Sequence, residues 1–236
     1  MVSRTMKAQG TLGAIRAVIF DMDGLMVDSE PLHTEATSLF FQRLGLTFNL
    51  DHRPDLVGRK TVESLAILKQ KYNLDMALED IFREREGIFL ELVRQKLQMR
   101  PGLEILLRRL KDAGYPLALA SSGYRAYVNL VLEKFHLWDF FQTLVTGDEA
   151  QEGKPSPEIF LLAAKRLGVP PTLCLVLEDS EHGVVAAKRA GMQCIAVPNS
   201  VTQGRDFSLA DVVVCSLEEV TVPLIQRLAP GTVPPA

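Results

Sequence analysis

The chain alternates short apolar runs with longer amphipathic segments over most of its length. The apolar runs have the length and the β-branched content that are typical of buried strands. They cover residues 17–20, 116–120, 143–145, 173–177, 194–197 and 212–214. Between the later runs, apolar residues recur at helical spacing over 102–114, 124–136, 157–168 and 180–190. Strands that alternate with helices predict an α/β fold with a doubly wound, Rossmann-like parallel sheet.

One long stretch interrupts this alternation, because no convincing strand follows the first one for some distance. The stretch contains three amphipathic segments instead, at 31–45, 60–73 and 76–98. Helices inserted as a block predict a separate all-helical cap. We expect a cap over 30–98, an α/β core made of 14–29 and 99–228, and frayed ends at 1–13 and 229–236.

The composition is typical of a soluble globular protein and excludes some classes of partner. Of 236 residues, 47% are hydrophobic and 23% are charged, and the formal net charge is -3. A charge this small provides no basic field for nucleic acid or a membrane surface. No run reaches the roughly 18 apolar residues of a membrane span.

The cysteines and the N-terminal sequence predict the compartment. Cys174, Cys194 and Cys215 each lie inside an apolar run, which favours buried thiols in a reducing environment. Residues 1–13 contain no apolar segment of signal-peptide length. We therefore expect a cytoplasmic protein. The sequence leaves the oligomeric state open, and a monomer is compatible with it.

Polar side chains follow several of the predicted strands at the point where each strand ends. In a parallel sheet these points share one edge, so we expect the side chains to meet there. In chain order they are Asp21, Asp23, Ser121, Ser122, Lys154, Glu178 and Asp179.

The chemistry of this set predicts a divalent cation and an anionic substrate. Carboxylates without histidine or thiolate form a hard oxygen site, which suits Mg²⁺. Asp21 and Asp23 are close enough to repel each other unless a cation lies nearby. Lysine and helix N-termini bind phosphate oxygens. Because the carboxylates outnumber the lysine, a phosphate dianion could enter the cleft only together with the metal.

These residues resemble, in order, the four motifs of the haloacid dehalogenase-like phosphohydrolases. The most specific matches are residues 21–30, DMDGLMVDSE, and residues 153–160, GKPSPEIF. A helical insertion directly after the first motif is similar to the cap of the subgroup that contains β-phosphoglucomutase and small phosphatases. The resemblance implies a Mg²⁺-dependent phosphatase for a small phosphorylated metabolite, such as a sugar phosphate or a nucleotide-like ester.

The resemblance also implies a role for each motif residue. Asp21 would be the nucleophile that forms an aspartyl-phosphate, and Asp23 the general acid and then the base. The phosphoryl oxygens would be held by Ser121, Ser122 and Lys154. The metal ligands would be Asp21, the main-chain carbonyl of Asp23, Glu178 and Asp179. The presence of Asp23 favours phosphoryl chemistry over dehalogenation, since dehalogenases of the superfamily lack this acid.

Other polar residues of the cap are candidates for contact with the substrate. His33 matches a histidine that faces the active site in the mutase-like subgroup, although a surface or hinge histidine is the alternative. Arg59 and Lys60 could reach a substrate anion or could be solvated. A charged helical face predicts solvent exposure for Arg83, Arg85, Arg94 and Lys96. Trp138, with Phe140 and Phe141, is expected in the core at a helix end and not on a stacking platform.

Two other functions stay open at this point. A β-phosphoglucomutase-like isomerase would need a second phosphate grip in the cap, but Thr61 stands where our alignment places an arginine in those mutases. A non-catalytic interaction protein on the same fold would be expected to have lost a motif residue, and none is lost.

Overall fold

The computed structural model describes residues 14–51 and 61–228. Its centre is a six-stranded sheet in the order β3-β2-β1-β4-β5-β6, and every neighbouring pair is parallel. The strands are β1 (Ala17–Phe20), β2 (Leu117–Ala120), β3 (Thr143–Val145), β4 (Cys174–Glu178), β5 (Gln193–Ala196) and β6 (Val212–Val213). The predicted doubly wound α/β fold is therefore confirmed.

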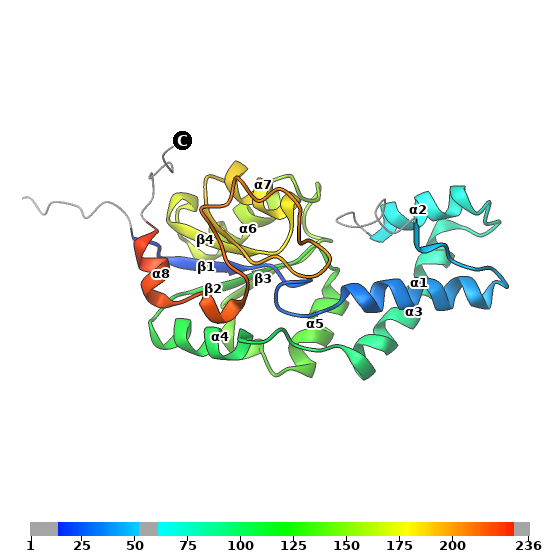
Figure 1. The fold of residues 1–236 in the computed structure, drawn as a ribbon, viewed down its shortest axis with the longest axis horizontal. Helices are drawn as coiled ribbons and strands as arrows, with labels where there is room; N and C mark the ends of the chain where they lie inside the picture. The colour runs from blue at the N-terminus through cyan, green and yellow to red at the C-terminus, as the bar shows by residue number, and fades with distance from the viewer. Residues whose placement is uncertain (1–13, 52–60, 229–236) are drawn as a thin grey trace, which may run out of the picture.

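Helices cover both faces of the sheet, as Figure 1 shows. Successive residues of β1 point to opposite faces: Val18 and Phe20 join one apolar cluster, while Ala17 and Ile19 join the other. The first face is covered by α4 (Leu103–Asp112), α5 (Arg125–Lys134) and α8 (Val222–Arg227). The second is covered by α6 (Glu158–Leu167) and α7 (Glu181–Arg189). Short 3-10 helices occupy Trp138–Phe140, Pro171–Leu173 and Leu217–Glu219.

Of the described helices between β1 and β2, all but α4 lie beyond the carboxyl ends of the strands (Figure 1). They are α1 (Glu30–Arg43), α2 (Thr61–Lys71) and α3 (Leu78–Lys96). Where the chain leaves the sheet and returns to it, the two connecting segments pair. Val27 and Met99 form an antiparallel bridge, and Asp28 N donates to Gln98 O at 3.0 Å. The segments that lead into α1 and out of α3 therefore lie side by side.

Three expectations about burial are wrong. Cys215 is exposed because it follows β6, a short strand at the edge of the sheet. Trp138 is 45% exposed, since it lies in a surface 3-10 turn rather than in the core. Arg85 is only 3% exposed, unlike the other charged residues of its predicted face, because it points between α3 and α1.

Two further expectations concern the ends of the chain and membrane-spanning helices. The segments expected to fray, 1–13 and 229–236, lie outside the described residues. Within the described ranges, no helix combines the length and hydropathy needed to cross a bilayer.

Candidate active site

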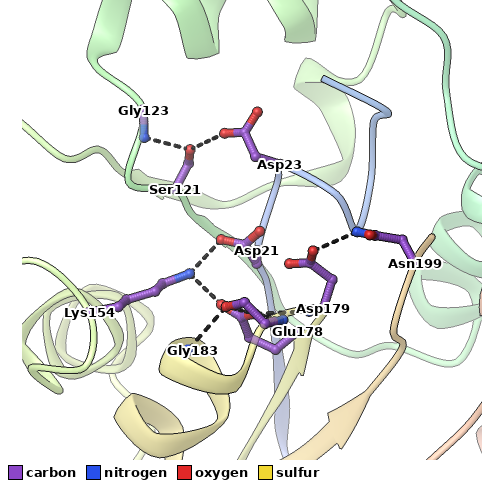
Figure 2. A network of polar contacts seen from close by, with 10 residues as sticks. Asp21, Asp23, Ser121, Gly123, Lys154, Glu178, Asp179, Gly183 and Asn199 are labelled. Atoms are coloured by element: carbon purple, nitrogen blue, oxygen red, sulfur yellow. Dashed lines mark hydrogen bonds and ion pairs between the residues drawn. The ribbon is translucent and has the colours of Figure 1, made fainter. Parts of the chain in front are cut away.

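Asp21 and Asp23 lie directly after β1, in the middle of the sheet's carboxyl edge (Figure 2). Because β2 and β4 flank β1, the residues at the ends of these neighbours reach the same point. Ser121 follows β2, and Glu178 is the last residue of β4. The edge thus gathers side chains from widely separated parts of the chain.

Lys154 joins two of these carboxylates. Its Nζ donates to Asp21 Oδ1 and, at 2.5 Å, to Glu178 Oε1 (Figure 2). Burial alone would favour the neutral amine, but the charges of Asp21 and Glu178 outweigh it and raise the pKa of Lys154. The lysine is therefore a fixed cation at the floor of the site.

One oxygen of Glu178 is held by polar groups of the turn that leads into α7. Its Oε2 accepts from Asp179 N at 2.8 Å, Ser180 N at 2.8 Å and Ser180 Oγ at 2.9 Å. Ser180 also caps α7 by accepting from Gly183 N at 3.1 Å. A Cβ at Gly183 would lie 1.8 Å from Glu178 Oε1, so this helix position has no room for a side chain.

Asp179 is held by a residue that follows β5. Asn199 Nδ2 donates to Asp179 Oδ2 at 2.7 Å and to the carbonyl of Gly24 at 3.2 Å. Gly24 has φ of +80°, and a Cβ there would lie 2.2 Å from Asp179 Oδ2. The turn after Asp23 therefore requires glycine both for its conformation and for the approach of this carboxylate.

The side chain of Asp23 points away from the other carboxylates of the site and toward three hydroxyls. Ser29 Oγ donates to its Oδ1 at 2.6 Å, Tyr127 Oη donates to the same oxygen at 2.5 Å, and Ser121 Oγ approaches Oδ2 at 3.4 Å. Burial raises the pKa of Asp23 above its ordinary value, and the hydroxyl hydrogen bonds oppose that rise. A carboxyl in this setting can hold and release a proton.

A metal ion fits the remaining acids. Asp21, Glu178 and Asp179 are buried and offer oxygens that lie within 4.8 Å of one another. Burial, with the charges of Glu178 and Asp23 added, raises the pKa of Asp21 to about 8 despite Lys154. Such crowding of buried carboxylates is relieved by a divalent cation, and an all-oxygen donor set suits Mg²⁺.

A cavity of about 310 Å³ opens above these residues, between the sheet edge and α1 to α3. This volume is within the usual range for small-molecule sites, roughly 300–1,000 Å³. Asp21, Asp23 and Lys154 line its floor. We call the opposite wall, formed by His33, Glu86 and Phe89 of α1 and α3, the roof.

The roof is held by Arg85. Its Nη2 lies 2.9 Å from His33 Nδ1 and donates to the carbonyl of His33 at 2.9 Å. A guanidinium has only donors, so His33 Nδ1 must accept and the imidazole proton lies on Nε2. Burial, with the Arg85 charge, lowers the pKa of His33 well below its ordinary value. The ring stacks on Phe89 with 4.0 Å between centroids.

The structure brings most of the predicted site residues to one place. The set around the floor comprises Asp21, Asp23, Ser121, Lys154, Glu178 and Asp179. Ser122 lines the cavity wall, and His33 lines the roof. Arg59 and Lys60 lie outside the described residues.

Several residues of the site were not predicted. Asn199 could have been found, because it is a polar residue just after the strand β5. Tyr127 and Glu86 carried no such signal, since each lies within a helix and meets the site only through tertiary packing. Ser29 stood inside the matched first motif, but nothing local pointed to its contact with Asp23.

Comparisons with known proteins agree with this geometry. Residues 18–197 match the model of the haloacid dehalogenase-like hydrolase family. The putative phosphatase YhcW of Bacillus subtilis is 36% identical over 212 residues, which are 89% of this chain and 96% of that protein. The probable pseudouridine-5'-phosphatase of Drosophila melanogaster is 36% identical over 218 residues, 90% of this chain and 94% of that protein.

A solved structure gives the same result at the level of the fold. CbbY from Rhodobacter sphaeroides, crystallised with phosphate, superposes with a TM-score of 0.81 and 31% identity, over 87% of this chain and 96% of CbbY. A mutant of CbbY has also been crystallised with xylulose-1,5-bisphosphate. On the family match and these identities, the chain belongs to the haloacid dehalogenase-like hydrolase family.

Proposed function

We propose that this protein is a Mg²⁺-dependent phosphatase that hydrolyses a small phosphorylated metabolite through an aspartyl-phosphate intermediate. Family membership and the phosphatases among its relatives make it a phosphoric monoester hydrolase. The observation that carries the mechanism is the pairing of two differently held carboxylates. Asp21 is fixed by Lys154, while Asp23 is held by hydroxyls.

In the first step, the Asp21 carboxylate attacks phosphorus and the bond from phosphorus to the leaving oxygen breaks. Asp23 gives its proton to that oxygen, so the alcohol leaves neutral. The elevated pKa that burial gives Asp23 favours the protonated starting form. Lys154, which donates to Asp21, would neutralise charge on the transferring group.

In the second step, Asp23 takes a proton from water. The water oxygen attacks phosphorus, the bond from phosphorus to Asp21 breaks, and inorganic phosphate is released. Ser121, whose Oγ accepts from Gly123 N at 2.9 Å (Figure 2), and Ser122, which lines the cavity, would hold phosphoryl oxygens. Mg²⁺, held by Asp21, Glu178, Asp179 and the main-chain carbonyl of Asp23, would offset the negative charge of the acids and the phosphate.

Replacement of the nucleophile tests this mechanism. Asp21→Asn is expected to reduce phosphate release from a phosphomonoester with Mg²⁺ by at least about 10³-fold, as for other lost nucleophiles. Asp112→Asn, a change of the same kind on the exposed end of α4, is the control and should retain wild-type turnover. Turnover of Asp21→Asn at the original rate would refute the mechanism.

Residues 30–98 would act as a cap that closes over the cavity. The support is that the roof comes from α1 and α3, and that the chain enters and leaves this block of helices through the paired segments at Val27 and Met99. Closure would exclude bulk water during transfer. Small-angle scattering should show a more compact particle with Mg²⁺ and a metal-fluoride phosphate mimic. Equal scattering with and without the mimic would contradict it.

The mutase reading is the second candidate. It would require a cation in the cap for a second phosphate, and Lys154 is the single lysine or arginine among the described residues that line the cavity. Thr61 lines it instead of a basic residue. Formation of glucose 6-phosphate from β-glucose 1-phosphate and a bisphosphate activator, faster than phosphate release, would reverse this ranking.

A cytoplasmic location remains part of the proposal, as does action on a small metabolite rather than nucleic acid.

A further inference from the structure

The three acids that fit a metal have one feature in common, because each already has an oxygen bonded to another group of the protein. Asp21 Oδ1 accepts from Lys154 Nζ. Glu178 Oε2 accepts from two backbone N–H groups and a hydroxyl, while its Oε1 accepts from Lys154 and keeps a second lone pair. Asp179 Oδ2 accepts from Asn199 Nδ2 at 2.7 Å. Each carboxylate therefore has one oxygen with which to bind a cation.

Asn199 is the group that engages Asp179, and its own amide is used on every side. It is 7% exposed. Nδ2 donates to Asp179 Oδ2 and to the carbonyl of Gly24, at 3.2 Å for the second contact. Oδ1 accepts from Val201 N at 2.8 Å and from Thr202 N at 3.1 Å. Because Oδ1 faces two N–H donors, the nitrogen is the end of the amide that meets Asp179.

This contact decides which oxygen of Asp179 is available. A Cβ at Gly24 would lie 2.2 Å from Oδ2, so the turn after β1 packs against the same oxygen that Asn199 bonds. The other oxygen of Asp179 points toward Asp21 (Figure 2). Gly24 directly follows Asp23, whose main-chain carbonyl is a further proposed ligand. The amide of Asn199 thus holds both Asp179 and the turn that carries this carbonyl.

The neutral charge of the amide matters as much as its hydrogen bonds. A lysine could also bond one oxygen of Asp179, as Lys154 does for Asp21. A second positive charge beside the acids would oppose the binding of a cation, whereas an amide orients the carboxylate without that penalty.

Single oxygens favour a small cation. Mg²⁺ takes an octahedral set of ligands and keeps several waters, whereas Ca²⁺ takes roughly six to eight oxygens and can bind a carboxylate through both of them. A freely turning Asp179 would offer both oxygens to the larger ion. The hydrogen bond from Asn199 works against that arrangement.

We propose that Asn199 is a positioning residue that sets the choice of metal. By holding Oδ2 of Asp179, it makes this acid a one-oxygen ligand and shifts the site toward Mg²⁺ and away from Ca²⁺. Since its amide is fully engaged, Asn199 acts through Asp179 and not as a ligand. The inference rests on the Mg²⁺ dependence proposed above, and it assigns ion selectivity to a residue outside the four motifs.

The test compares two ions in the absence of substrate. Calorimetric titration of the metal-free protein with MgCl₂ and with CaCl₂ at pH 7 gives the ratio of the Ca²⁺ dissociation constant to the Mg²⁺ dissociation constant. Asn199→Ala should weaken Mg²⁺ binding about 10- to 100-fold, the usual cost of a lost partner behind a metal ligand. Ca²⁺ binding should weaken less, because the released Asp179 can offer both oxygens. The ratio should therefore fall by about tenfold or more.

Two other variants keep the test sharp. Asn199→Asp retains an acceptor for the two N–H groups of the turn and removes the donor, so it decides the question if Asn199→Ala fails to fold by circular dichroism. Its added charge acts on both ions, and the ratio should still fall. Asn129→Ala makes the first change on a half-buried asparagine of α5, outside the described lining of the cavity, and should keep the wild-type ratio.

The outcomes separate ion selectivity from the enzyme activity. An unchanged ratio in a folded Asn199 variant overturns the inference, as does equal weakening of both ions or an equal fall of the ratio in Asn129→Ala. Absence of Mg²⁺ binding to the wild type would overturn it together with the proposed Mg²⁺ dependence. Mg²⁺ binding without turnover of any phosphomonoester would refute the phosphatase function alone, because the titrations contain no substrate.

Discussion

The phenol oxygen of Tyr127 lies 2.5 Å from Oδ1 of Asp23, although 104 residues separate them along the chain. Tyr127 is 2% exposed and also makes an edge contact with Phe89, with 5.0 Å between ring centroids. Tyr127 therefore fixes Asp23, the proposed acid and base, and also contacts Phe89 of the roof. Its hydroxyl is a positioning group, because it acts through Asp23.

Removal of that hydroxyl should slow the chemistry more than binding. Tyr127→Phe keeps the ring and its packing, so we expect kcat to fall about tenfold, the equivalent of one lost hydrogen bond, with KM within about twofold. Steady-state kinetics with a phosphomonoester measures both. Tyr115→Phe, just before β2 at the opposite end of the sheet, is the control. A rise in KM alone would show that Tyr127 acts on binding instead.

Gly183 should not tolerate a side chain. In Gly183→Ala the new Cβ would displace the Glu178 carboxylate, which Lys154 and Ser180 hold in place. We expect the free energy of unfolding to fall by about 1–3 kcal/mol, as in overpacked cores, together with loss of activity. Urea denaturation and phosphate release would measure these effects.

The matched control for that change is Gly87→Ala. Gly87 lies within α3, and a Cβ there would meet nothing within 4 Å. Alanine should therefore stabilise the protein, by about 0.5–1 kcal/mol. If both alanine variants had the same free energy of unfolding, a clash with Glu178 could not be the cause of any stability loss in Gly183→Ala.

Magnesium binding should release protons. Because the pKa of Asp21 is raised to about 8, this carboxyl is largely protonated at neutral pH without metal, and a ligand must be ionised to bind. The apparent affinity should therefore increase with pH up to about 8. Calorimetry at pH 7 in buffers of different ionisation enthalpy would detect the released protons. Asp179→Asn should weaken binding, and removal of the metal with EDTA should abolish turnover and lower Tm.

Glu149 should make the free energy of unfolding depend on pH in the acidic range. The hydrogen bond from Arg166 Nη2, at 2.5 Å, is the main cause that lowers the pKa of Glu149 from 4.5 to about 2. Its stabilisation is complete above about pH 4.5, where both folded and unfolded states are ionised, and is lost as the pH falls toward 2.

Replacement of this carboxylate should show that pH dependence. Glu149→Gln should cost about 1 kcal/mol at pH 7, a value kept small because the pair is partly exposed, and less at pH 3. Urea denaturation at both pH values measures the difference. Glu133→Gln, an exposed carboxylate on α5, is the control. An equal cost at pH 7 and pH 3 would contradict an electrostatic origin.

The floor of the site could be predicted because its residues obey a local rule. Each follows or ends a strand with a clear apolar run, and parallel pairing then carries them to one edge. Asn199 obeys the same rule, because it is a polar residue shortly after the apolar run 194–197. The helices of 30–98 were predictable as helices for a similar reason, since their periodicity is local.

The roof could not be predicted in this way. Arg85 and Glu86 belong to a run of charged residues, and such a run usually marks a solvated helical face. Their burial depends on His33, on a different helix more than fifty residues earlier, which supplies the partner for the guanidinium. Pattern along the chain does not encode that pairing.

The central place of β1 has a consequence for synthesis of the protein. Val18 pairs with Leu117 on one side and with Leu175 on the other, so the first strand made waits for partners from the middle and the last third of the chain. On the ribosome, one edge of β1 keeps its backbone N–H and C=O groups unpaired until β4 has emerged, and such edges promote association between chains. A nascent chain that stops before Cys174 would contain both aspartates of the first motif and would still be inactive. It would depend on chaperones to prevent association.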